Sequence, residues 1–285
     1  MVSKKTFNFY IVVLFFFYFF CIQSEQLYDT TKSFEENINL TLLATGGVTR
    51  AEQFQELLDA GADIAMSGTG MMWDPYLASE YHHVQKKTLL QRLFEIDAIK
   101  FGNFTLRSGK VSPVYCDLRS IVSYPDILQL LSDCIGFHLQ HINCKFICGV
   151  PYTGLPIATA VSISHSKPMV LKRKEAKEYG TKKMVEGIFK AGDSCVVIED
   201  VITTGSSILE TTQALEHEGL VINNIIVCID RQQAGMECII QKGYKIWALF
   251  TLAEILLYAR EAGFINEQVY IMGLDFIREN KVPGA

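Results

Sequence analysis

The sequence CVVIEDVITTGSS (residues 195–207) joins an apolar run to two adjacent acids and then to a cluster of Thr, Gly and Ser. The apolar run has the length of a buried strand, and the cluster leads into a helical pattern that Gly219 ends. Burial of charge is costly unless a partner pairs with it, so Glu199 and Asp200 at a strand end indicate a ligand. Backbone N–H groups at a helix start, with neighbouring hydroxyls, favour a phosphate. We therefore expect a ribose 5-phosphate, with its hydroxyls on the acids, its phosphate on the turn and Mg²⁺ near the sugar.

Two other structures fit part of this stretch. An ordinary strand–turn–helix would use Ser206 as the N-cap of the helix and would need no ligand. A nucleotide P-loop would need the pattern Gly-x4-Gly-Lys-Ser/Thr, which is absent here. The acidic pair directly before the turn favours the sugar-phosphate site over both.

On either side of this stretch, short apolar runs alternate with helical patterns, which predicts an α/β fold with a central parallel sheet and helices on both faces. A hairpin-like hood is predicted over 101–119, where alternating residues flank turn signals. The predicted strands are 146–150, 168–173, 195–200, 221–230 and 245–250. The predicted helices are 88–99, 154–164, 206–219, 234–243 and 251–263.

The N-terminal part of the chain has a different pattern. Residues 38–80 read as one β-α-β unit with Gly-rich turns, in which Thr49 and Glu52 have the spacing of a capping box. Before it, Lys4 and Lys5 precede an uncharged run of 15 residues over 7–21, shorter than the roughly 20 residues that span a membrane.

We therefore predict three regions. They are a signal-like or anchor-like segment with a polar tail (1–35), a barrel-like β-α-β fragment (36–83) and the main α/β domain (84–285). An alternative of equal weight is that the first segment is an extension joined to a cytosolic enzyme. We expect a cytoplasmic protein, with membrane contact or secretory targeting only if residues 7–21 are retained.

Composition narrows the class of protein. Hydrophobic residues make up 49% and charged residues 20%, which is typical of a folded domain, and the formal net charge of −5 argues against a nucleic-acid binder. Most of the eight cysteines sit in apolar runs, as buried free thiols do in a reducing compartment. A metal site at Cys144 and Cys148 is the weaker alternative, because no second Cys/His pair accompanies them.

The stretch VVIEDVITTGSS resembles the phosphoribosyl diphosphate (PRPP) signature of type I phosphoribosyltransferases. Four more stretches, 101–119, 149–159, 171–187 and 228–235, are similar to the orotate phosphoribosyltransferase family over about residues 84–285. The resemblance implies transfer of ribose 5-phosphate from PRPP to N1 of orotate, giving orotidine 5′-phosphate and diphosphate. It also implies Mg²⁺ bound through PRPP without direct protein ligands, and a homodimer in which a mobile loop reaches the neighbouring subunit.

The resemblance assigns roles to individual residues. The catalytic residues it implies are Lys174, Lys177 and Asp200. The implied PRPP-binding residues are Arg107, Tyr152, Thr153, Arg173, Lys174, Lys177, Tyr179, Glu199, Asp200, Val201, Ile202, Thr203, Thr204, Gly205, Ser206 and Ser207. The implied orotate-binding residues are Tyr115, Cys116, Thr203 and Arg231.

Four positions depart from the pattern of the family. Some members have Lys at Thr153 and His at Tyr179, many have Lys at Arg107, and Cys116 replaces one residue of an aromatic pair. Loss of a cation at Thr153 leaves more of the diphosphate charge to the loop and to Mg²⁺.

Residues 42–78 resemble the last β-α-β unit of a dihydroorotate dehydrogenase barrel. A barrel needs all of its strands to close, so we expect this fragment to bind no FMN and to be dispensable for transfer. Two alternatives to a stand-alone enzyme remain: a PRPP-sensing regulator on the same fold, and the transferase part of a UMP synthase system. Retention of Lys174 and Lys177 favours an enzyme.

Overall fold

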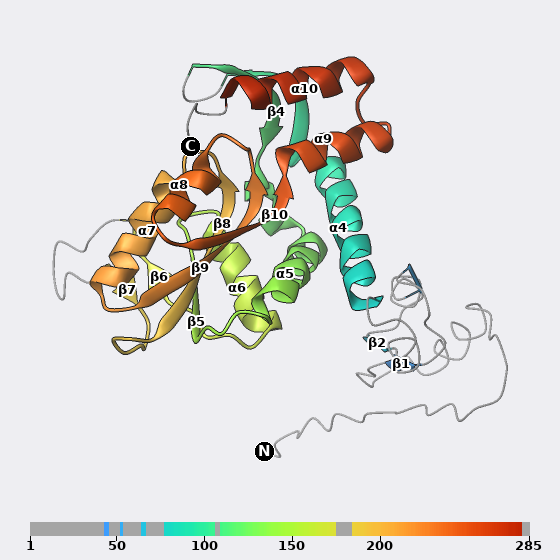
Figure 1. Cartoon of the computed structure of the whole chain (residues 1–285). Coiled ribbons are helices and arrows are strands. Elements are labelled where there is room, and N and C mark those ends of the chain that lie inside the picture. The colour runs from blue at the N-terminus through green and yellow to red at the C-terminus, as the bar shows by residue number, and fades with distance from the viewer. Residues whose placement is uncertain are drawn as a thin grey trace, which may run out of the picture. The chain divides into compact units, whose positions relative to one another are not determined.

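The computed structural model describes residues 43–45, 52–53, 64–66, 77–105, 109–174 and 184–280 (Figure 1). Its contacts divide the chain into two compact units, Met1–Gln85 and Lys86–Ala285. Helix α4 (Leu77–Glu95) begins in the first unit and ends in the second. The three-region division stays a prediction.

The first unit contains the two strands expected from the β-α-β pattern. Strands β1 (Leu43–Thr45) and β2 (Ile64–Met66) pair in parallel, with Leu43 opposite Ile64. The Thr49 cap and the two Gly-rich turns lie outside the described residues, as does the apolar run 7–21. No helix in the described part of the chain is long and apolar enough to cross a membrane.

The second unit is built on a sheet of four parallel strands, which confirms the prediction of a central parallel sheet (Figure 1). The strand order is β10-β9-β8-β5. The strands are β5 (Phe146–Gly149), β8 (Ser194–Ile202), β9 (Val221–Asp230) and β10 (Lys245–Thr251).

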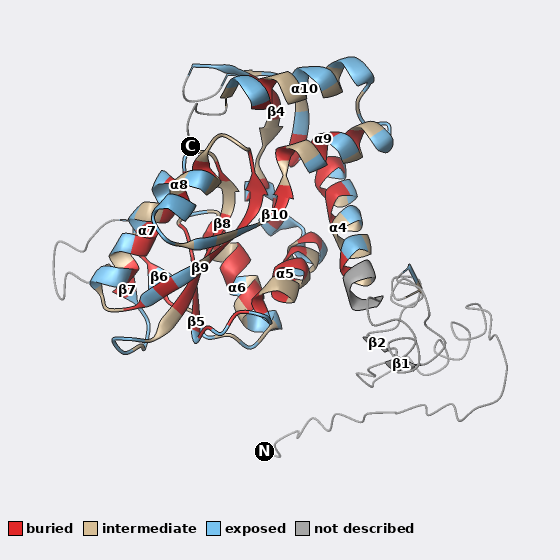
Figure 2. Cartoon of the chain, in the orientation of Figure 1, coloured by how far each residue is buried: buried red, intermediate tan, exposed pale blue. Residues whose placement is uncertain are grey.

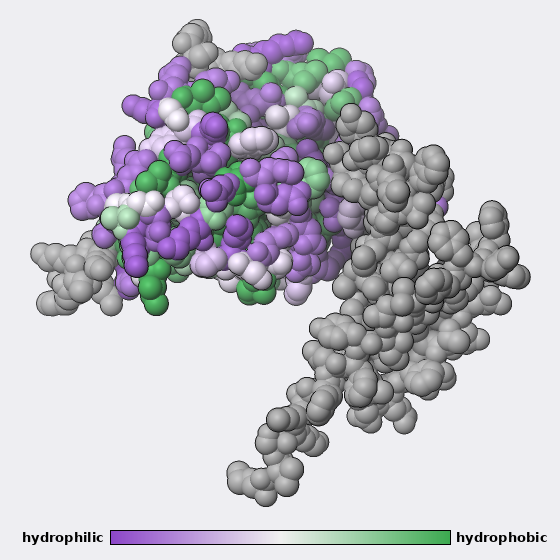
Figure 3. All heavy atoms as spheres, turned by 60° about the horizontal axis from the view of Figure 1, so that its bottom comes forward, coloured by the Kyte–Doolittle hydropathy of each residue, from purple (hydrophilic) through white to green (hydrophobic). Residues whose placement is uncertain are grey.

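Both faces of this sheet are covered, which explains why its strands read as nearly continuous apolar runs. Successive strand residues point to opposite faces, so Cys195 and Val197 enter one core cluster while Val196 and Ile198 enter the other. The first cluster packs under α7 (Ser206–His217) and α8 (Gly235–Gln241). The second packs under α4, α5 (Pro125–Leu139), α6 (Gly154–Ser164) and α9 (Leu252–Glu261). Figure 2 shows the buried residues along these inner faces, and the described surface in Figure 3 is largely hydrophilic.

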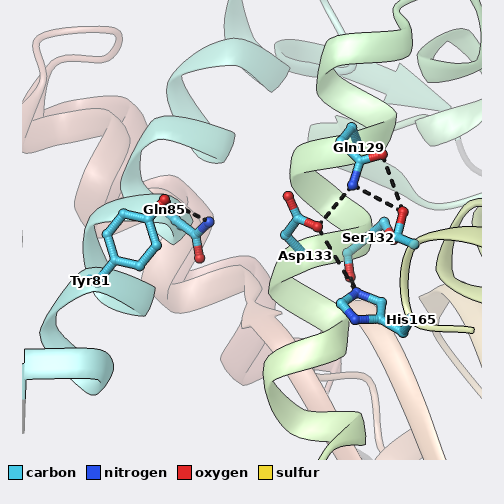
Figure 4. Close-up of polar contacts among 7 residues, drawn as sticks. Tyr81, Gln85, Gln129, Ser132, Asp133 and His165 are labelled. Carbon is cyan, nitrogen blue, oxygen red and sulfur yellow. Dashed lines mark hydrogen bonds and ion pairs between the residues drawn. The ribbon is translucent and has the colours of Figure 1, made fainter. Parts of the chain in front are cut away.

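Helices α5 and α6 are also joined by polar contacts (Figure 4). The Gln129 amide donates to Asp133 Oδ1 (2.9 Å) and to Ser164 Oγ (3.0 Å). The ring Nε2 of His165 lies 3.1 Å from the carbonyl oxygen of Ser132. The contacts of Ser164 and His165 tie the C-terminal end of α6 to α5, while the bond from Gln129 to Asp133 lies within α5.

The predicted hood is an antiparallel hairpin of β3 (Ile99–Thr105) and β4 (Val111–Cys116), whose pairing shifts between Phe101 and Phe104. A short 3-10 helix (Leu118–Ser123) follows it. Helix α10 (Glu267–Asn280) packs on β4 and on α9 (Figure 1). The hood therefore rests on the C-terminal helix.

The structure corrects several predicted elements. The expected strand 168–173 only touches the sheet: Met169 bridges Ile147, and the chain then leaves as β6 (Leu171–Lys172) to pair with β7 (Val185–Glu186). Helix α4 ends at Glu95, four residues before its predicted end, because Ile99 already begins β3. Helices α5 and α10 were not predicted. The alternative Ser206 cap is wrong, because Gly205 is the N-cap and Ser206 the first helical residue.

Strand β5 and helix α6 approach each other too closely for a side chain at Gly149. A Cβ there would overlap the carbonyl oxygen of Gly154, which is backbone and cannot turn away. We predict that Gly149→Ala lowers the free energy of unfolding by about 3 kcal/mol, measured by urea denaturation. The control is Gly263→Ala, where φ is +79° and no atom lies within 4 Å, so only backbone strain of about 1 kcal/mol is expected. Equal losses in the two variants would contradict the close approach.

Candidate functional site

The loops after β5, β8 and β9 meet at one edge of the sheet, because parallel strands end on the same side. Gly149, the last residue of β5, pairs with Ile198, so the last four residues of β8 run past the end of β5. Ile202, the last residue of β8, pairs with Asp230. Glu199 and Asp200 thus lie three and two residues before the end of β8, and not at its end as predicted. The edge brings Tyr152 and Thr153, the 203–205 turn and Arg231 into one region.

Glu199 is buried at this edge and Asp200 is half-buried. Burial, followed by the neighbouring Asp200 carboxylate, raises the pKa of Glu199 from 4.5 to about 9. Its Oε1 accepts the backbone N–H of Asp200 at 3.1 Å. This shift favours the protonated form of Glu199 in the absence of a ligand. A cation or hydroxyl donors beside the pair would favour its charged form.

The turn after β8 has the geometry of an anion site. Gly205, with φ of 80°, is the N-cap of α7 and offers no side chain to its first turn. The first N–H groups of a helix have no partner within the helix, so they are suited to an anion. The Oγ atoms of Thr204 and Ser206 lie 3.3 Å apart beside them. The backbone and hydroxyl groups that the predicted cradle needs thus lie together at the start of α7, and their binding of an anion stays a prediction.

Two residues of the predicted diphosphate set meet from different loops. Lys174 Nζ lies 5.0 Å from the ring centroid of Tyr152, whose side chain is exposed. Arg173 is held by Glu186 of β7, to which its Nε donates at 2.7 Å. The predicted residues Arg107, Lys177 and Tyr179 lie outside the described residues.

Arg231 is a buried cation, only 7% exposed. Its Nη2 donates to Ser112 Oγ at 3.1 Å, and its Cζ lies 6.0 Å from the ring centroid of Phe276. Its Nε is buried without a hydrogen-bond partner, and none of the ion pairs found among the described residues includes it. Burial lowers the pKa of Arg231. A buried guanidinium with an unused N–H is suited to an anionic ligand.

The two hood residues predicted for the base have different surroundings. Tyr115 stacks on Phe104 at 5.3 Å between centroids, and its Oη accepts from Arg119 Nη2 at 3.1 Å. Burial raises the pKa of the Cys116 thiol to about 11, while Arg231 opposes the shift. Neighbouring residues of a strand point to opposite faces, so Cys116 is on the side of Arg231 and Tyr115 is on the other.

Three residues around the site were not predicted from the sequence. Ser112 and Phe276 contact Arg231, and Lys172, with 4% of its side chain exposed, donates to Glu210 of α7 at 2.5 Å. Lys172 is one of six Lys and Arg residues in the run 172–183, and no local sequence pattern indicates that it is the buried one. The apolar spacing of 267–280 could have revealed the helix that carries Phe276, but not its contact with Arg231.

Two family models match the chain. A phosphoribosyl transferase domain matches residues 119–249, and a dihydrouridine synthase (Dus) model matches residues 22–103. The second match covers the whole N-terminal fragment and fits its dehydrogenase-like pattern.

Similar proteins point to one family. Orotate phosphoribosyltransferase of Chlamydia caviae is 44% identical over 166 residues, which are 58% of this chain and 81% of that protein. Uridine 5′-monophosphate synthase of Bos taurus is 41% identical over 200 residues, which are 70% of this chain and 42% of that protein, so the chain spans less than half of it. The structure of Leishmania donovani UMP synthase matches with a TM-score of 0.63 and 27% identity, over 90% of this chain and 65% of that one. These likenesses confirm the predicted type I phosphoribosyltransferase fold, and the chain belongs to the orotate phosphoribosyltransferase family.

Proposed function

We propose that this chain transfers ribose 5-phosphate from PRPP to N1 of orotate, giving orotidine 5′-phosphate and diphosphate. The observation that carries the proposal is the edge of the sheet that joins a phosphate-suited helix start at Gly205 to a buried cation at Arg231. A sugar phosphate suits the first group and an anionic base suits the second. Both substrates of the family therefore have a place at one site.

On the PRPP side, the turn from Thr203 to Ser207 holds the 5′-phosphate, and Glu199 and Asp200 accept the ribose hydroxyls. In the transition state the sugar gains positive character while diphosphate leaves with more negative charge. Cations are therefore needed around the leaving group. Those available are Lys174 beside Tyr152, and Arg173, joined by Arg107 and Lys177 on the basis of their sequence pattern. Thr153 and Tyr179 add hydroxyl groups to the same set.

Mg²⁺ fits this site as an ion held through PRPP. Across the described residues, no group of three or more His, Cys, Asp or Glu side chains could hold a metal alone. Burial first, and then the neighbouring Asp200 carboxylate, raise the pKa of Glu199, and a cation beside the pair would oppose both effects. When bound, the ion would neutralise part of the diphosphate charge, while Glu199 and Asp200 hold the sugar that carries it.

On the base side, the Arg231 guanidinium takes the carboxylate of orotate. Cys116 borders the same space, and Thr203 lies between the base and the sugar. The side chain of Tyr115 is on the other face of β4, so its proposed contact with the base is made by its backbone. The neutral form of the half-buried Cys116 thiol, whose pKa is about 11, adds no competing negative charge.

We place the reaction in the cytoplasm and in a homodimer whose loop serves the neighbouring site. The first part of this proposal is supported by the cysteines that the structure describes, all of which are free thiols. The second part rests on the loop sequence 172–183, which carries six Lys and Arg residues.

Asp200→Asn is expected to impair the use of PRPP far more than folding. Loss of one charged hydrogen bond to the ribose should cost about 1.5–3 kcal/mol, seen as a higher KM for PRPP or a lower kcat, with the unfolding midpoint nearly unchanged. The control is Asp275→Asn, which removes a half-exposed surface ion pair with Arg278. If Asp200→Asn behaves like the control, Asp200 does not bind the ribose.

Lys177→Ala is expected to lower kcat and to leave the affinity for orotate nearly intact, because its charge matters most as diphosphate leaves. Mixing Lys177→Ala with Asp200→Asn protein should restore activity, since a mixed dimer has one site with both groups native. A mixture of two Lys177→Ala preparations is the control. No recovery after verified subunit exchange would show that the loop acts within its own subunit.

PRPP binding with Mg²⁺ is expected to release a proton from Glu199 at pH 7.5. The free protein holds this proton because the pKa is about 9, and a cation with ribose hydroxyls lowers that pKa. Binding calorimetry in two buffers of different ionisation enthalpy measures the release, and Glu199→Gln supplies the background from PRPP itself. Identical proton counts for the wild type and Glu199→Gln would contradict this role of Glu199.

A further inference from the structure

Arg231 can select the base only if its guanidinium is held in one orientation. The side chain follows β9 on a loop, and Arg231 lacks an acidic partner among the ion pairs of the described residues. Its neighbours instead come from two distant parts of the sequence, Ser112 of β4 and Phe276 of α10. Ser112 and Phe276 are both buried, so the packing of the hood and of α10 fixes the two groups that contact Arg231.

The hydrogen bonds of Ser112 leave its hydroxyl no freedom to turn. The hydroxyl has one hydrogen and two lone pairs, and its hydrogen goes to the Val114 carbonyl oxygen at 2.7 Å. The oxygen then accepts the Val114 N–H at 3.2 Å and Arg231 Nη2–H at 3.1 Å. Ser112 is 0% exposed, so water cannot replace any of these partners. The lone pair that meets Arg231 therefore points in one direction.

Phe276 covers the guanidinium from the C-terminal helix. Its ring, itself buried, lies 6.0 Å from Arg231 Cζ. Helix α10 is fastened to the hood, where Lys110 Nζ donates to Asn280 Oδ1 at 2.7 Å, and Figure 1 shows α10 lying along β4. A ring over the cation favours its charge and keeps water away. One Nη2 hydrogen is thus bonded to Ser112 and one side of the guanidinium is covered, while the buried Nε–H has no hydrogen-bond partner.

We propose that Ser112 and Phe276 are positioning residues that aim Arg231 at the carboxylate of the base and so set the preference for a carboxylated pyrimidine. This inference rests on the proposed function and deepens it. The hood and helix α10 would then influence which base is bound, because they orient Arg231.

The test compares two nucleotides that differ only in that carboxylate. Orotidine 5′-phosphate carries it and uridine 5′-phosphate does not, so their ratio of affinities isolates the contact with Arg231. Calorimetry on the full chain should show that Ser112→Ala weakens orotidine 5′-phosphate about tenfold and leaves uridine 5′-phosphate unchanged. Ser132→Ala is the matched control, because Ser132 is also 0% exposed, its Oγ has no partner and it lies on α5. This variant should change neither affinity.

Phe276→Leu provides a second variant if Ser112→Ala does not fold. It keeps an apolar side chain at the position and should also lower only the affinity for orotidine 5′-phosphate, with a higher KM for orotate and an unchanged KM for PRPP.

Two results would overturn the inference while leaving the proposed function intact. The first is a wild-type preference for orotidine 5′-phosphate that both variants retain, and the second is an equal loss for both nucleotides, which indicates general loosening. A wild type with no preference between the nucleotides would instead overturn the proposed role of Arg231.

Discussion

The acidic side chain of Glu199 and the basic side chain of Arg231 are both buried at the carboxyl edge of the sheet, and they do not pair with each other. Burial penalises the charged form of each, and it raises the pKa of Glu199 while lowering that of Arg231. A protein that kept them only for stability would gain by pairing them or by replacing them with apolar residues. Their separate burial is understandable if each has a ligand of its own, a sugar with its cation for Glu199 and an anionic base for Arg231.

The strand register places Glu199 and Arg231 at the same edge of the sheet, the first on β8 and the second just after the neighbouring strand β9. Strand β8 runs past β5 and ends level with β9, so the acids, the Gly205 turn and Arg231 follow one another along the same edge. The close approach of Gly149 to Gly154 allows the Tyr152 turn to join them from the other side. The backbone thus places the acids, the Gly205 turn, the Tyr152 turn and Arg231 at one edge of the sheet, and Ser112 of the hood contacts Arg231.

The sequence alone predicted the features that depend on neighbouring residues. The strands around CVVIED and VINNIIVCID are apolar because both faces are buried, and turn residues marked the hood hairpin and the start of α7. Features that depend on distant residues escaped prediction. The run PMVLKR resembles any sheet strand, and only its pairing with Val185 takes it away from the sheet. The contacts of Arg231 with Ser112 and Phe276 join residues far apart in the chain, so no local pattern announces them. The roles of Arg107, Lys177 and Tyr179 stay predictions.

We propose that Glu199 binds a sugar phosphate and that Arg231 binds an anionic base in one reaction. The most direct test incubates the full chain with PRPP, Mg²⁺ and either orotate or uracil, and measures the loss of base absorbance and the nucleotide formed. Orotate is expected to be converted to orotidine 5′-phosphate with release of diphosphate, and uracil is expected not to be used. No turnover of orotate, or turnover of uracil at the same rate, would contradict it.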